Sequence, residues 1–158
     1  IIHIYYIMSI LRRINNEIIK DWTDEYQNDT NIHHIETNYQ DVKFIIFLNP
    51  LQNPILITMD ITNSCYPFKP PKVYIGHNKK EYKTLLHSTW SFSEKIIGNE
   101  CMCCNSILCK WSCQYCMKDI VEEIKKNFNL KIRMMEIAHC KKIVDKYFGH
   151  YLPIEEFL

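Results

Sequence analysis

Three prolines within eight residues constrain the fold of this chain more than any other feature. Residues 66–73 read Tyr-Pro-Phe-Lys-Pro-Pro-Lys-Val. Each proline fixes its own φ angle and removes a backbone N–H donor, so the segment can be neither a helix nor a central strand. We therefore expect a rigid, extended crossing between two strands, with Tyr66 and Phe68 available as packing anchors.

Apolar periodicity predicts regular elements on both sides of this crossing. Apolar residues recur at helical spacing over residues 9–22, where Ser9 can cap the helix. Segments rich in β-formers follow at residues 32–37, 42–48 and 55–61, and a short one at 72–75 comes after the prolines. Their short connections favour an antiparallel meander.

The C-terminal half predicts a long loop and two helices. Residues 76–100 show no periodicity, and long loops in compact domains are often functional. One apolar stripe then runs from Met117 to Phe128, and a second ends at Gly149. We expect an α+β domain with an N-terminal helix, a four-stranded antiparallel sheet, a long active-site loop and C-terminal helices. We expect residues 8–158 to form this domain and residues 1–7 to be an upstream extension.

Charge and hydropathy narrow the class of protein. The 158 residues carry 19 Lys+Arg against 18 Asp+Glu, which does not indicate a broad surface for nucleic acid or membrane. No apolar run reaches the roughly 18 residues that span a bilayer. We expect a reducing compartment, the cytoplasm or the nucleus, or the host cytoplasm if the gene is viral.

Six of the eight cysteines lie within residues 101–116. A disulfide framework would tie distant segments together, so this clustering indicates thiol chemistry or metal binding instead. Cys113 and Cys116 have C-x-x-C spacing, and with Cys109 they are the alternative zinc ligands. Because the cysteine spacing suits an active-site loop better than a tetrahedral site, we expect no metal.

Several segments resemble one family. Residues 66–73, directly after an apolar strand, resemble the signature of ubiquitin-conjugating enzymes. Residues 13–18, Arg-Ile-Asn-Asn-Glu-Ile, resemble the family's first helix. Residues 104–108, Cys-Asn-Ser-Ile-Leu, resemble its active-site segment, and Trp111 with Ser112 resembles its Trp-Ser-Pro. The resemblance covers about residues 9–130 and implies the family's fold.

The chain also departs from the family's pattern. Cys113 replaces the proline of Trp-Ser-Pro. The family's His-Pro-Asn triplet is missing, and its nearest counterpart begins at His87 and keeps only the histidine. In the family that asparagine supports the oxyanion or orders the loop. Backbone N–H groups, or an amide such as Asn99 or Asn105, would have to replace it.

The resemblance implies an acyl transfer without a cofactor and without ATP binding. A thiol would accept ubiquitin or a ubiquitin-like protein from an activating enzyme and pass it, with a ligase, to a substrate lysine. A thiol suits this role because it is both a nucleophile and a good leaving group. Arg12, Arg13, Lys20 and Phe68 are then candidate partner-binding residues.

Three cysteines compete for the role of nucleophile. Cys104 heads the Cys-Asn-Ser-Ile-Leu segment and is favoured. Cys101 has a glycine three residues before it, and Cys103 lies eight residues before Trp111, both family spacings. Two other functions stay open. The chain could be a catalytically silent ubiquitin-binding variant of the same fold, or a zinc-binding module built on the cluster at residues 101–116.

Overall fold

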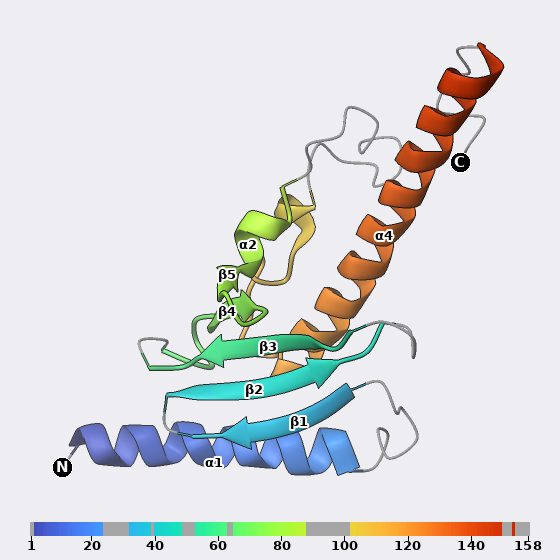
Figure 1. Ribbon diagram of the computed structural model, residues 1–158. Coiled ribbons are helices and arrows are strands. Elements are labelled where there is room, and N and C mark those ends of the chain that lie inside the picture. The colour runs from blue at the N-terminus through green and yellow to red at the C-terminus, as the bar shows by residue number, and fades with distance from the viewer. Residues whose placement is uncertain are drawn as a thin grey trace.

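The computed structural model describes residues 2–23, 32–38, 40–48, 53–62, 65–87, 102–149 and 153, and of residues 2–7, 19–23, 34 and 148 only the backbone. Within these residues the chain is an α+β domain (Figure 1). Its elements are α1 (Ile2–Thr23), β1 (Ile32–Thr37), β2 (Asp41–Ile46), β3 (Ile55–Asp60), β4 (Lys72–Ile75), β5 (Lys80–Glu81), α2 (Tyr82–Leu85), the 3-10 turn η1 (Cys103–Asn105) and α4 (Met117–Phe148).

The sheet is an antiparallel meander, as the short connections predicted. Its strands follow one another in chain order, β1-β2-β3-β4-β5. Alternate residues of β2 (Val42, Phe44 and Ile46) are fully buried and face the core. The predicted number of four strands was wrong. Two residues, Lys80 and Glu81, return along β4 as β5, and a pair of charged residues gives no hydrophobic alternation to reveal it.

Helix α1 was predicted correctly in kind but not in its start. It begins at Ile2, so Ser9 lies inside the helix and is not its N-cap. Residues 2–8 contain neither proline nor glycine, so nothing in them stops the helix from extending. Ile10 and Ile14 are buried in the core, and α1 contacts α4.

One continuous helix, α4, replaces the two predicted C-terminal helices. The two apolar stripes are joined because Leu130 packs against the core and Met134 is fully buried between them. Gly149 ends the helix in a left-handed conformation, as predicted. In Figure 1 α4 rises diagonally from the sheet, and its C-terminal half extends beyond the strands. Among the helices that the structure describes, none is long and apolar enough to cross a membrane.

The proline segment forms a turn at its start, which corrects the predicted extended crossing. The N–H groups of Phe68 and Lys69 both donate to the carbonyl of Cys65, at 2.7 and 3.1 Å. They are the amide donors left between the prolines, so one carbonyl satisfies both. Of the two aromatic residues expected to be packing anchors, Tyr66 is fully buried, whereas Phe68 is 74% exposed.

Candidate functional site

Two neighbouring thiols lie at the surface on η1. The Sγ atoms of Cys103 and Cys104 are 3.9 Å apart, and neither cysteine forms a disulfide. Cys104 is exposed and Cys103 is half-buried. Two of the three candidate nucleophiles therefore lie together, and the third, Cys101, falls outside the described residues.

A histidine from another element lies beside this pair. His87 follows α2, and its Nδ1 is 4.0 Å from Sγ of Cys103. This is the long end of a hydrogen bond to sulfur. The fold thus brings together a thiol and an imidazole that are 16 residues apart in sequence. A thiol beside an imidazole is the arrangement that activates a cysteine for attack on an acyl group.

A carboxylate of α4 holds the loop that carries the thiols, residues 102–116, which we call the cysteine loop. Glu123 accepts a hydrogen bond from the Ser106 hydroxyl at 2.8 Å and another from the Ile107 N–H at 2.6 Å. Ser106 is buried, and its Oγ in turn accepts the N–H of Leu108, which is itself in the core. The turn that follows the thiols therefore has its polar groups satisfied in one geometry.

The same face of α4 also holds α2, which precedes His87. The Tyr82 hydroxyl donates to Glu123 at 3.1 Å and accepts from the Asn127 amide at 2.8 Å. One turn further along, the Lys131 ammonium donates to the carbonyl of Leu85. Glu123, Asn127 and Lys131 are four residues apart and so lie on one face of the helix. This polar ladder connects α2 and the cysteine loop to one rigid element.

Burial shifts the pKa of two groups that take part in these contacts, Tyr82 of α2 and Lys131 of α4. Loss of solvent, reinforced by the charge of Glu123, raises the pKa of the Tyr82 hydroxyl far above its ordinary value. Tyr82 is therefore a fixed hydrogen-bond donor across the working pH range. Burial also lowers the pKa of Lys131. Its hydrogen bond to the Leu85 carbonyl holds this half-buried side chain in place.

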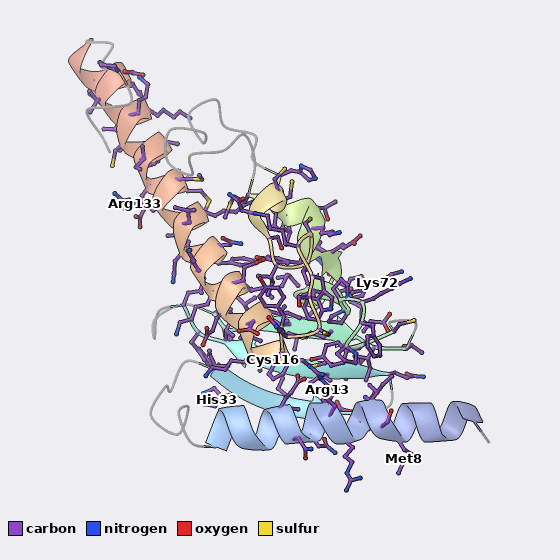
Figure 2. All side chains as sticks on the ribbon, turned by 180° about the vertical axis from the view of Figure 1, so that it is seen from behind. Met8, Arg13, His33, Lys72, Cys116 and Arg133 are labelled. Atoms are coloured by element: carbon purple, nitrogen blue, oxygen red, sulfur yellow. The ribbon has the colours of Figure 1, made fainter. Side chains whose placement is uncertain are left out.

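A second carboxylate, Glu17, joins α1 to the proline turn and to α4. It accepts from the Tyr66 hydroxyl at 2.6 Å, from Nε of Arg13 at 2.7 Å and from the Met117 N–H at 3.3 Å. Figure 2 labels Arg13 and Cys116 where α1 meets the first turn of α4. Glu17 thus positions the first turn of α4, the helix that carries the polar ladder.

The candidate partner-binding residues fall into different environments. Arg12 and Phe68 are exposed. Arg13 is engaged within the chain, because it pairs with Glu17, donates to the Cys113 carbonyl at 2.9 Å and lies over the Tyr66 ring. The side chain of Lys20 lies outside the described residues.

The remaining site candidates are placed as follows. Asn105 is exposed, and its amide oxygen accepts a hydrogen bond from the Lys110 ammonium at 3.0 Å. Asn99 lies outside the described residues. An open cleft of about 670 Å³ runs between the cysteine loop and α4, and Asn105, Ile107 and Glu122 are among the residues that line it.

The alternative zinc ligands lie at the end of the same loop. Cys109 and Cys113 are exposed, and Cys116 is half-buried at the start of α4. Burial raises the pKa of the Cys116 thiol to about 12, so this sulfur resists the deprotonation that a metal ligand needs. In the part of the chain that the structure describes, no three Cys, His, Asp or Glu side chains are grouped to hold a metal ion.

Comparison of the chain with models of protein families, with curated proteins and with solved structures gave no match. The chemistry of the site must therefore be inferred from its own residues. Sequence reasoning named both thiols and His87 as candidates but singled out neither Glu17 nor Glu123. A signal existed for Glu17, since an acidic residue three positions after Ile14 lies on the buried face of an amphipathic helix.

Proposed function

We propose that this chain accepts ubiquitin or a ubiquitin-like protein as a thioester on Cys104 and transfers it to a substrate lysine. The observation that carries the proposal is an exposed thiol on a turn whose following residues are held by Glu123. A thioester needs a nucleophile that a protein donor can reach and that leaves easily afterwards. A surface thiol meets both requirements.

The rigidity of the loop supports transfer to an amine. The carbonyl carbon of the thioester must meet the lysine nitrogen at near-attack distance, and a misplacement of about 1 Å can cost about 100-fold in rate. Ser106 and Leu108, both buried, anchor the loop immediately after the thiols. The cleft beside Asn105 gives an extended C-terminal tail of the modifier a place along α4.

Contact between two of the segments that carry the family resemblance gives further support. The indole N–H of Trp111 donates to the Pro67 carbonyl at 2.8 Å, and the Trp111 ring packs against Tyr66. The proline turn and the cysteine loop thus brace one another. Exposed Phe68 at the tip of this turn is the proposed contact for a ligase or an activating enzyme, and Arg12 contributes from α1.

The missing asparagine of His-Pro-Asn affects the second half of the reaction. Lys110 holds the amide oxygen of Asn105, so the amide N–H groups are the donors that remain for an oxyanion. An exposed side chain of this kind is a weak donor compared with a buried one. We therefore propose that transfer to free lysine is slow and that a ligase accelerates it.

Charging with a labelled modifier tests this proposal. The whole protein is incubated with activating enzyme, ATP and labelled ubiquitin, and the products are separated without reducing agent. We expect an ATP-dependent adduct that dithiothreitol removes and that the double variant Cys103→Ser, Cys104→Ser lacks. Cys109→Ser, which changes an exposed cysteine of the same loop, is the control and keeps the adduct. Binding of ubiquitin without any adduct would instead identify a catalytically silent variant.

A further inference from the structure

We propose that Cys103 is a second acyl carrier, to which the acyl group moves from Cys104 while His87 accepts the Cys103 proton. This inference rests on the proposed function, in which Cys104 receives the modifier. Two distances carry it, 3.9 Å between the sulfur atoms and 4.0 Å from the Cys103 sulfur to the imidazole.

The two thiols differ in exposure and in their contact with His87, which suits them to different steps. Cys104 is exposed, so a large protein donor can reach it. Cys103 is half-buried and is the thiol in contact with His87. The better-exposed sulfur is therefore suited to receive the acyl group, and the sulfur beside the base is suited to hold it when a proton must be removed from an attacking amine.

The distance between the sulfur atoms suits direct exchange. Once an acyl group is attached to Cys104, its carbonyl carbon is one bond from that sulfur and can turn toward Cys103. A sulfur 3.9 Å away can then meet the carbon at about 3–3.5 Å, which is a near-attack distance. The bond that breaks and the bond that forms are both cysteine thioesters, so the step is close to balanced in free energy and needs no external driving force.

The step conserves atoms and electrons. Nδ1 of His87, in the tautomer that leaves it unprotonated, takes the proton of the Cys103 thiol. The Cys103 thiolate attacks the carbonyl carbon and forms a carbon–sulfur bond, and the bond from that carbon to the Cys104 sulfur breaks. The departing Cys104 thiolate takes the proton from the imidazolium. The products are a thioester on Cys103 and a thiol on Cys104.

The polar ladder of α4 holds the imidazole of His87 close to the two thiols. Lys131 holds the carbonyl of Leu85, two residues before His87, and Glu123 holds Ser106, two residues after Cys104. The contact between Cys103 and His87 thus depends on one helix and not on two independent loops. A base held in this way can contribute about 100-fold to a proton transfer.

A small thioester tests the exchange without an activating enzyme. A glycine-terminated peptide, activated as a thioester of mercaptoethanesulfonate, is mixed with the whole protein, and samples are quenched in acid over time. Tandem mass spectrometry then assigns the acyl group to Cys103 or Cys104. We expect the label first on Cys104 and later on Cys103. His87→Ala should slow the shift about 100-fold without changing the first acylation, and added imidazole should restore the rate.

Several outcomes would overturn the exchange. The proposal fails if the acyl group stays on Cys104, or if it moves to Cys103 at the same rate in His87→Ala. It also fails if Cys103 of the Cys104→Ser variant is acylated as fast as the wild-type protein in its first step, or if the acyl group is found on Cys101. His77→Ala, which removes an exposed histidine after β4, is the control and should behave as wild type. If the peptide moves between the thiols but ubiquitin never charges, the proposed function fails and the exchange stands. If ubiquitin charges Cys104 and stays there, only the exchange fails.

Discussion

The hydroxyl of Tyr66 donates a hydrogen bond of 2.6 Å to the carboxylate of Glu17, 49 residues away. This bond connects the proline turn to α1 at a fully buried aromatic ring. Loss of solvent, reinforced by the charge of Glu17, raises the pKa of Tyr66 well above its ordinary value, so the bond persists to high pH. Glu17 also accepts the N–H of Met117, so the same carboxylate positions α4.

Two aromatic residues of the proline segment should therefore respond very differently to truncation. Tyr66→Ala should lower the free energy of unfolding by about 3–5 kcal/mol, the cost of removing a large ring from a core. Tyr66→Phe should cost about 1 kcal/mol, the net value of one hydrogen bond. Phe68→Ala is the matched control and should stay within about 0.5 kcal/mol, since Phe68 is 74% exposed. Urea unfolding measures all three, and equal losses in Tyr66→Ala and Phe68→Ala would contradict the packing described here.

Removal of Glu123 should loosen the loop that carries the two thiols. Glu123→Ala leaves the Ser106 hydroxyl and the Ile107 N–H without their acceptor, which should cost about 1–3 kcal/mol for each buried group left unpaired. The cysteine loop should loosen as a result. Hydrogen exchange of residues 102–110 should accelerate more than exchange in β2. Glu136→Ala, at an exposed position further along α4, is the control, and an equal acceleration there would refute the role of Glu123.

The Cys116 thiol should make the domain less stable at alkaline pH. Burial raises the pKa of Cys116 to about 12 in the folded chain, whereas an unfolded cysteine ionises near about 8.5. Below about pH 8.5 both states keep the proton, and stability is complete. As the pH rises from there toward 12, the unfolded state releases its proton while the folded state retains it, so stability falls. Tyr66 and Tyr82, whose pKa values are also raised, act in the same direction.

Unfolding at about pH 8 and about pH 10.5 measures this decline. Cys116→Ser should make it shallower, because serine does not ionise in this range. Cys109→Ser, at an exposed position of the same loop, should leave it unchanged. A decline of the same slope in Cys116→Ser would show that other groups cause the alkaline loss.

Purified protein should contain no stoichiometric zinc. Cys109 and Cys113 are exposed, and Cys116 holds its proton strongly, so the three do not offer the deprotonated, converging ligands of a structural site. Elemental analysis before and after treatment with a chelator measures this. One equivalent of zinc whose removal unfolds the domain would favour the zinc-binding alternative.

The sequence allowed an antiparallel sheet and the helical regions to be predicted because their signals are local. The alternation in β2 and the stripe of α1 each appear within a few residues. The start of α1 and the union of the two C-terminal stripes into α4 were missed for a related reason. Helix ends depend on stop signals, and neither Ser9 nor the polar residues around Leu130 provide one.

The site could be predicted only in part. Cysteine spacing and the family resemblance pointed to Cys103 and Cys104, and the missing triplet pointed to His87. The contact between Cys103 and His87 could not be predicted, because it depends on α2 and the cysteine loop meeting on one face of α4. Glu123 holds α2 and the cysteine loop together by accepting three hydrogen bonds from residues 16 to 41 positions away. No local sequence pattern encodes such contacts.

Charging of single-cysteine variants tests most directly whether Cys104 receives the modifier. Cys101→Ser, Cys103→Ser and Cys104→Ser are each incubated with activating enzyme, ATP and labelled ubiquitin, and the adducts are compared with and without dithiothreitol. We predict that Cys101→Ser and Cys103→Ser form a normal adduct that dithiothreitol removes. Cys104→Ser should form either no adduct or an oxygen ester that dithiothreitol leaves intact. A normal, dithiothreitol-sensitive adduct on Cys104→Ser, with none on Cys103→Ser or Cys101→Ser, would contradict the assignment.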